Sequence, residues 1–271
     1  MNVTVNDVTY YVDKRGSGEP ILFLHGFTGD HSTWRKIGTH FEKEFQVISV
    51  DIIGHGATEI PSDPTRYDIK KVAADLASIL KEMNIDHIHL IGYSMGGRLA
   101  LTFALLYPCK VKTLILESSS PGLKTAKERS DRVKRDQMLA KKILTEGITS
   151  FVDYWEKIPL FSTQQHLPSA KKQQLRTQRL QQSELGLANS LRGMGTGKQP
   201  SWWDNLHELN IPVLLLTGEL DEKFCHIADQ MLVKMKHAHH YIFPGCGHAI
   251  HVEEPENFVT IVLEFLSTKQ D

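Results

Sequence analysis

The stretch Gly92-Tyr93-Ser94-Met95-Gly96 decides the fold of this chain. It follows the apolar run at residues 87–91 and precedes a helical pattern that begins at Gly97. A strand, G-x-S-x-G and a helix in this order form a nucleophile elbow, whose glycines allow a turn so sharp that the serine is strained and its hydroxyl is exposed. Glycine and serine are common in turns, so the pentapeptide alone could arise by chance. Its flanks favour Ser94 as a reactive residue.

The composition places the chain among ordinary globular proteins. Its 271 residues are enough for one large domain, and 41% hydrophobic and 23% charged residues fit that class. A net charge of −1 argues against a general binder of polyanions, so we expect no nucleic-acid partner. No apolar run approaches the roughly 20 residues that a membrane span needs, so we expect no membrane association.

The N-terminus and the cysteines indicate the compartment. The first seven residues lack the basic region and apolar stretch of a signal peptide. Cys109, Cys225 and Cys246 are an odd, widely spaced set without a C-x-x-C pair, which is typical of reduced thiols. We therefore expect a cytoplasmic protein. No apolar face is left over for a partner, so a monomer is the default expectation.

Buried strands alternate with helices along most of the chain. Continuous apolar runs predict strands that are buried on both faces, at residues 20–24, 45–50, 111–116, 212–216 and, more weakly, 240–243. Helical spacing follows Asp68, and another helical pattern starts near Pro255. Residues 3–12 predict an opening hairpin. The alternation predicts an α/β fold with a mostly parallel central sheet flanked by helices.

The alternation stops between residues 121 and 206, where the pattern is helical and polar. An insertion at this point would cover the carboxyl ends of the strands, where open α/β sheets bind ligands. We therefore expect a core of residues 1–120 and 207–271 and a helical cap of residues 121–206. The glycine-rich segment 193–197 follows no strand, so we interpret it as a cap turn rather than a phosphate loop.

A serine needs a histidine to take its proton, and that histidine needs an acid to orient it. In this architecture the chain order is serine, acid, histidine. Asp221 follows the strand at 212–216 and is favoured over Glu219, which lies closer to the strand end. His248 directly follows a glycine turn and is favoured over His251. The predicted catalytic residues are therefore Ser94, Asp221 and His248.

The loop after the strand at 20–24 is expected to complete the site. In this fold, one backbone N–H from that loop and one from the residue after the serine form the oxyanion hole, which predicts Phe27 and Met95. His25 is expected to orient the loop through hydrogen bonds. The loop 51–56 suits a tight packed turn and receives no chemical role. The histidines and cysteines have no metal-ligand spacing, so neither a metal nor an organic cofactor is expected.

Taken together, the H-G-F loop at 25–27, the elbow, the acid loop at 218–224 and Gly247-His248 resemble the α/β-hydrolase superfamily over essentially the whole chain. Within it, the chain is similar to the MenH family of the menaquinone (vitamin K2) pathway. That resemblance rests on three stretches: Gly92 to Arg98, Ser120-Pro121-Gly122-Leu123 before an arginine-bearing helix, and Asp153-Tyr154-Trp155 with Pro159 and Phe161 after it.

The resemblance implies a lyase, 2-succinyl-6-hydroxy-2,4-cyclohexadiene-1-carboxylate (SHCHC) synthase. This activity eliminates pyruvate from 2-succinyl-5-enolpyruvyl-6-hydroxy-3-cyclohexene-1-carboxylate by general-base chemistry. The partner would be a small-molecule polycarboxylate. The resemblance also implies a set of substrate-binding residues: Tyr93, Arg98, Arg132, Trp155 and Arg176. In the first cap helix, Arg129 is the alternative to Arg132 as the arginine that faces the pocket.

Arg98 separates this interpretation from its main alternative. It lies one helical turn after Ser94, on the pocket side of the expected helix. The planar guanidinium binds carboxylates through two hydrogen bonds, which a polycarboxylate substrate requires. The alternative is a serine hydrolase that acts on carboxylic esters or on C–C bonds of ring-cleavage products, with the same catalytic residues. A catalytically idle ligand receptor is disfavoured because serine, acid and histidine are all present.

Overall fold

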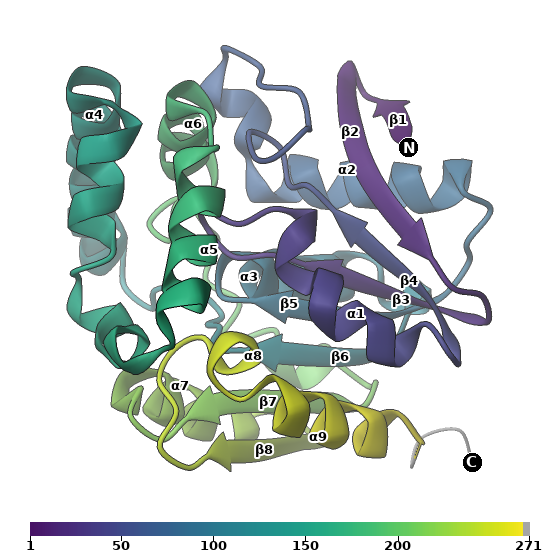
Figure 1. The fold of residues 1–271 in the computed structure, drawn as a ribbon. Helices are drawn as coiled ribbons and strands as arrows, with labels where there is room; N and C mark the ends of the chain where they lie inside the picture. The colour runs from purple at the N-terminus through teal and green to yellow at the C-terminus, as the bar shows by residue number, and fades with distance from the viewer. Residues whose placement is uncertain (268–271) are drawn as a thin grey trace.

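The computed structural model describes residues 1–267, and its centre is a sheet of eight strands between two layers of helices (Figure 1). The strands are β1 (Asn2–Val5), β2 (Val8–Arg15), β3 (Glu19–Leu24), β4 (Phe45–Val50), β5 (Ile88–Tyr93), β6 (Val111–Glu117), β7 (Val213–Gly218) and β8 (Ala238–Phe243). Their order across the sheet is β1-β2-β4-β3-β5-β6-β7-β8. The β1–β2 and β2–β4 pairs are antiparallel and all other pairs are parallel.

The helices fall into a flanking set, a set at the strand ends and several short turns. The α-helices are α1 (Arg35–Phe41), α2 (Ile69–Glu82), α3 (Met95–Leu106), α4 (Ala126–Trp155), α5 (Ser169–Leu180), α6 (Glu184–Met194), α7 (Glu222–Leu232), α8 (Ile250–Glu253) and α9 (Pro255–Ser267). The 3-10 helices are η1 (His31–Trp34), η2 (Pro64–Tyr67), η3 (Pro108–Lys110), η4 (Pro159–His166) and η5 (Leu206–Glu208). The predicted α/β architecture, its opening hairpin and its strands are confirmed. The strand at 240–243 is not buried on both faces as expected, because β8 lies at the edge of the sheet and only Phe243 of its residues is buried.

The two faces of the sheet bury separate apolar clusters. Leu22 and Leu24 of β3 pack on the side of α2, α3 and α7, whereas Ile21 and Phe23 pack on the side of α1 and α9. Successive side chains of a strand point to opposite faces, so a strand covered on both faces must be apolar throughout. This explains why the central strands read as unbroken apolar runs.

Residues 121–206, all of which the structure describes, contain the helices α4, α5 and α6 and no strand. These helices stand on the side toward which the arrows of β6, β7 and β8 point (Figure 1). They have an apolar cluster of their own, formed by α4 and α6. α4 is interrupted at Gly147, whose φ of 81° and ψ of 168° are not helical. The segment therefore stands over the carboxyl ends of the parallel strands.

The two ends of this inserted segment are held side by side. The N–H of Trp202 donates to the carbonyl of Pro121 at 2.8 Å, and the indole N–H of Trp203 donates to the carbonyl of Gly122 at 2.9 Å. Trp203 is buried against the core beneath. Among residues 1–267, no helix has both the length and the apolar character needed to cross a membrane.

Candidate active site

The G-x-S-x-G segment forms a sharp turn between β5 and α3. Ser94 has φ 50° and ψ −104°, a strained backbone conformation for a residue with a side chain. A Cβ on Gly96 would lie 2.2 Å from the carbonyl oxygen of Leu24, and a Cβ on Gly92 would lie 2.5 Å from that of Gly96. Only glycine fits at both positions. The close packing holds Ser94 at the carboxyl end of β5.

Ser94, His248 and Asp221 form one hydrogen-bonded chain. The Ser94 hydroxyl Oγ lies 3.0 Å from Nε2 of His248, and Nδ1 of His248 lies 2.6 Å from Oδ2 of Asp221. His248 is 1% exposed and Asp221 is 8% exposed. The Asp221 carboxylate can only accept a hydrogen bond, so it keeps the proton of the neutral imidazole on Nδ1 and leaves Nε2 to accept from the serine. The geometry is that of a nucleophile, a base and an orienting acid.

Both alternative residues have other partners. Glu219 Oε2 accepts a hydrogen bond from the N–H of Gly245 at 2.9 Å, away from His248. His251 Nδ1 lies 2.8 Å from Oε1 of Glu117, and both side chains are buried. The Glu117 carbonyl also accepts from the N–H of Ser94 at 2.8 Å. The Glu117–His251 pair, which the sequence did not reveal, thus braces the base of the elbow.

The loop after β3 lies beside the elbow, because β3 and β5 are adjacent. Met95 is the first residue of α3, so its N–H has no partner within the helix. Phe27 lies in the β3 loop, and its ring packs against Trp155 at 5.4 Å between centroids. His25 accepts from the N–H of Ile52 at 3.0 Å through Nε2 and contacts the carbonyl of Gly26 at 2.8 Å through Nδ1. His25 therefore orients this loop, as predicted.

A cavity of about 210 Å³ opens at the Ser94 hydroxyl, between the core and the inserted helices. Its polar and charged wall residues are Ser94, Arg98, Ser118, Ser119, Ser120, Arg132, Ser190, Thr196, Lys223 and His248. Its aromatic wall residues are Phe27, Tyr93, Trp155, Phe161 and Phe224. No aspartate or glutamate is among the described residues that line it. The wall residues thus carry positive charge and no negative charge, although Asp136, which is not a wall residue, pairs with Arg132 at 2.7 Å.

Arg98 is the most buried cation of this cavity, with 9% of the residue exposed. Its Nη1 donates to the carbonyl of Met194 at 2.8 Å and to Oε1 of Gln199 at 3.1 Å, both of which are neutral acceptors. Burial, followed by the like charge of Arg132, lowers the pKa of Arg98 to about 10. Met194 is the last residue of α6 and lies in the glycine-rich segment 193–197, so the end of this helix helps to position the arginine.

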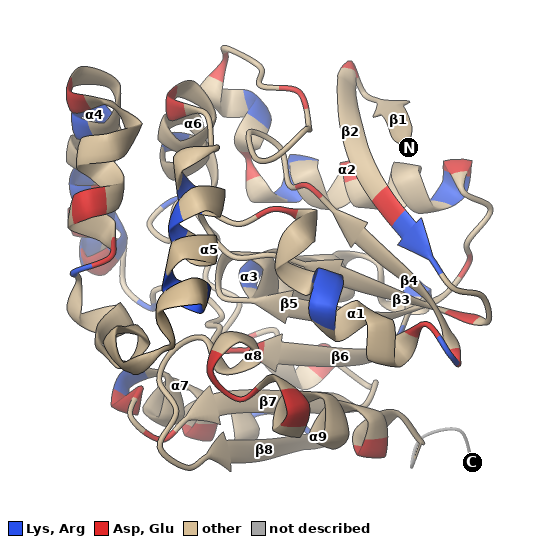
Figure 2. Ribbon diagram, in the orientation of Figure 1, with Lys and Arg blue, Asp and Glu red and all other residues tan. Residues whose placement is uncertain are grey.

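Arg132 lines the cavity, whereas Arg129 does not. Arg132 Nε donates to Oδ1 of Asp136 at 2.7 Å, one turn further along α4. Arg129 instead donates to the backbone carbonyls of Leu123 and Lys124. Other charges of both signs are spread along α4 (Figure 2). Of the two candidate arginines on this helix, the structure brings Arg132 to the site.

The structure does not bring Arg176 to this cavity. Its guanidinium pairs with Asp153 at 2.7 Å and Glu156 at 2.8 Å, two acids near the end of α4. Arg179, one turn further along α5, lies closer to the cavity wall, with its guanidinium carbon 5.2 Å from the centre of the Phe161 ring. The prediction that Arg176 binds substrate in this cavity is therefore corrected, because the side chain forms ion pairs with the acidic residues at the end of α4.

Two buried donors in the cavity wall have no protein partner. The Ser118 hydroxyl and the indole N–H of Trp155 make no hydrogen bond among the described residues. Ser118 is fully buried, at the carboxyl end of β6. An unpaired buried donor costs about 1–3 kcal/mol, and neither group has an acceptor among the described residues that offsets this cost. Trp155 was predicted as a wall residue; Ser118, Gln199 and Lys223 were given no role from the sequence.

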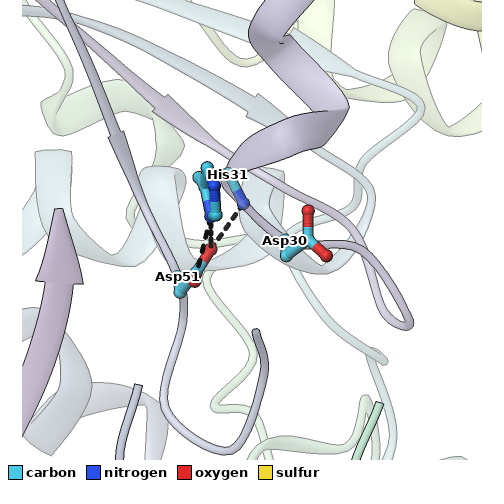
Figure 3. Close-up of side chains that lie close together, drawn as sticks. All are labelled: Asp30, His31 and Asp51. Atoms are coloured by element: carbon cyan, nitrogen blue, oxygen red, sulfur yellow. Dashed lines mark hydrogen bonds and ion pairs between the residues drawn. The ribbon is translucent and has the colours of Figure 1, made fainter. Parts of the chain in front are cut away.

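Asp30, His31 and Asp51 lie close together near the β3 and β4 loops (Figure 3). Asp51 accepts from both the backbone N–H and the ring of His31, and from the N–H of Ala57. Asp30 accepts from the N–H of Ser32 at 2.8 Å. These carboxylates are already used by protein donors, so the cluster fits a loop brace better than a metal site.

The charge state of this brace depends on pH. The hydrogen bond to Asp51 raises the pKa of His31 above its ordinary value of 6.5, although partial burial opposes the shift. Because the folded-state pKa is the higher one, the stabilisation is fully present below about pH 6.5. It is lost as the pH rises through the raised pKa.

The fold and the serine–histidine–aspartate arrangement define an alpha/beta hydrolase, and the profile of that fold matches residues 19–255. Within this class, a putative 2-succinyl-6-hydroxy-2,4-cyclohexadiene-1-carboxylate synthase of Bacillus subtilis (strain 168) is 45% identical, in an alignment that covers 99% of this chain and 98% of that protein. The chain belongs to the alpha/beta hydrolase family and, within it, to the family of these synthases.

Two further relatives agree with this family. The synthase of Klebsiella pneumoniae (strain MGH 78578) is 31% identical, over 95% of this chain and 98% of that protein. The solved structure of MenH from S. aureus superposes with a TM-score of 0.92 and 38% identity, over 97% of this chain and 99% of that one.

Proposed function

We propose that this protein is an SHCHC synthase, a lyase of menaquinone biosynthesis that eliminates pyruvate from 2-succinyl-5-enolpyruvyl-6-hydroxy-3-cyclohexene-1-carboxylate. One observation carries the proposal: the cavity at Ser94 holds Arg98 and Arg132 and has no acidic residue among its described walls. A buried cation without a carboxylate partner favours an anionic ligand. The substrate has several carboxylates, and the synthases similar to this chain carry the name of this reaction.

The first step is removal of a carbon-bound proton. His248 takes the proton of the Ser94 hydroxyl, and Asp221 stabilises the imidazolium that forms. The Ser94 oxygen then takes the proton next to the succinyl carbonyl, acting as a general base rather than forming an acyl-enzyme. The N–H groups of Phe27 and Met95 stabilise the enolate oxygen, and one such donor contributes about 3–4 kcal/mol.

The second step breaks the bond to the leaving group. The electron pair of the enolate returns through the ring double bond, which shifts, and the ring C–O bond breaks. The leaving enolpyruvate takes up one proton at carbon and becomes pyruvate. The charges balance because one proton leaves the ring and one joins the leaving group. Arg98 and Arg132 hold the carboxylates during both steps.

A pyruvate-release assay tests the proposal. Wild-type protein should release pyruvate from the enolpyruvyl substrate, followed with a coupled lactate dehydrogenase reaction, and Ser94→Ala should lower the rate by at least about 10³-fold. Unchanged release by Ser94→Ala protein would exclude the role of the serine. The hydrolase alternative predicts instead rapid hydrolysis of p-nitrophenyl esters without pyruvate release. Both substrates should therefore be measured on the same preparation.

A further inference from the structure

Lys223 is a third cation of the catalytic cavity, and it comes from the core rather than from the cap. It lies in the first turn of α7, two residues after Asp221, and it lines the cavity although the residue as a whole is exposed. Among the described residues it makes no ion pair. Its nearest aromatic contact is the Phe224 ring, with Nζ 5.3 Å from the centroid.

The surroundings of Lys223 oppose its positive charge. Desolvation, followed by the like charges of Arg132 and Arg135, lowers the pKa of Lys223, and the charge of Asp221 opposes this shift. The Asp221 carboxylate is already bonded to His248. The first turn of a helix also disfavours a cation, because the N-terminal end of the helix dipole is positive. An ammonium group in this place therefore lacks a protein counter-ion.

Two residues that line the same cavity, Ser118 and Trp155, each have a buried donor, a hydroxyl and an indole N–H, without a protein partner. Arg98, the remaining unpaired cation, binds only a carbonyl and an amide oxygen. Positive groups and free donors thus reach the cavity from α3, α7, β6 and α4.

We infer that Lys223 forms a carboxylate subsite at the mouth of the cavity, which binds one carboxylate of a dicarboxylate while Arg98 binds another deeper in the cavity. This inference rests on the proposed function, since it assigns the substrate class of the same site. It makes the protein selective for molecules with two or more carboxylates over neutral esters of similar size. Lys223 acts on binding and not on proton transfer.

Succinate, a small dicarboxylate, is the direct probe. Its dissociation constant should be measured by isothermal titration calorimetry on the wild-type chain and on Lys223→Met, which removes the charge but keeps most of the stem. Because Lys223 is exposed, we expect about a fivefold weaker affinity. Lys223→Arg should stay within about threefold of wild type. A loss below threefold in Lys223→Met overturns the subsite.

A matched control and a pH series separate binding from a structural role. Lys234→Met removes an exposed lysine just beyond the same helix, outside the cavity, and should leave the affinity unchanged. In wild type, both the Lys223 ammonium and Arg98, whose pKa is lowered to about 10, lose a proton at alkaline pH. In Lys223→Arg only Arg98 does so, and its affinity should therefore start to fall at a higher pH than that of wild type. A parallel pH profile in both proteins would contradict the inference.

Catalysis distinguishes failure of the subsite from failure of the proposed function. If pyruvate is released, Lys223→Met should raise KM about fivefold and leave kcat within twofold. If no pyruvate is released but succinate binding still requires Lys223, the carboxylate subsite is supported and the proposed synthase reaction is refuted. If Lys223→Met releases pyruvate with an unchanged KM and binds succinate as tightly as wild type, the synthase reaction is supported and the carboxylate subsite is refuted.

Discussion

Replacement of Arg98 by methionine tests the charge requirement of the cavity most directly. The change keeps much of the apolar stem and removes the guanidinium, which is buried and bonded only to Met194 and Gln199. Both acceptors then lose a donor, which destabilises the fold by about 1–3 kcal/mol for each group left unpaired. The substitution also removes a buried positive charge that Arg132 repels, and this gain offsets part of the destabilisation. We expect a net change within about 2 kcal/mol, or less than about 8 °C in Tm.

The effect on the reaction should be larger and selective. A hydrogen bond between a guanidinium and a carboxylate contributes about 1.5–3 kcal/mol, which corresponds to about 10- to 150-fold in kcat/KM. A neutral ester has no carboxylate for Arg98 to bind, so its turnover should stay within about threefold. The charged substrate alone should therefore lose most of its turnover.

The assay compares pyruvate release with hydrolysis of p-nitrophenyl acetate at 25 °C on Arg98→Met and on a control, Arg192→Met. Arg192 lies on α6, outside the cavity, and its one side-chain bond is to Asn189 at 3.5 Å. The control should retain wild-type kcat/KM for both substrates. Equal losses for the charged and neutral substrates, or less than a threefold loss of pyruvate release, would refute the assignment of Arg98 to carboxylate binding.

Three other variants follow from hydrogen bonds at the site and in the His31–Asp51 brace. Asp221→Asn should lower kcat by about 10⁴-fold, because an amide favours the wrong tautomer of His248. Glu219→Gln, which disturbs only the bond to Gly245, should stay within about threefold of wild type by the same assay; similar losses in both would exclude the assignment of the acid. His31→Gln should lower the free energy of unfolding in urea by about 0.5–1 kcal/mol near pH 5.5 and by less near pH 8.5, and a loss independent of pH would contradict the His31–Asp51 ion pair.

The fold could be predicted from the sequence because its signals are local. Each central strand is buried on both faces, so it appears as an unbroken apolar run such as residues 20–24. The elbow is equally local, since close packing of Gly92 and Gly96 leaves no alternative to glycine. The order of strands and helices then determines which loops lie at the same edge of the sheet.

The walls of the cavity could not be predicted to the same extent. On α5 only Leu175 and Leu180 are strongly apolar within a polar helix, so the pattern does not indicate whether Arg176 or Arg179 faces the core. The ion pairs of Arg176 depend on where α4 ends, which is a tertiary feature. Lys223 likewise becomes a wall residue only when α7, α4 and β6 come together. The type of a residue does not by itself predict which other elements it will contact in the folded chain.

The joined ends of the inserted segment have a consequence for how such enzymes diversify. Trp202 and Trp203 hold the C-terminal end of the inserted segment beside its N-terminal end at Pro121 and Gly122. For the core, residues 121–206 are therefore equivalent to one long loop whose two ends are joined. The entropy of closing a loop depends only weakly on its length. A different inserted segment joined at the same two ends would therefore change the substrates of the enzyme and leave its catalytic residues in place.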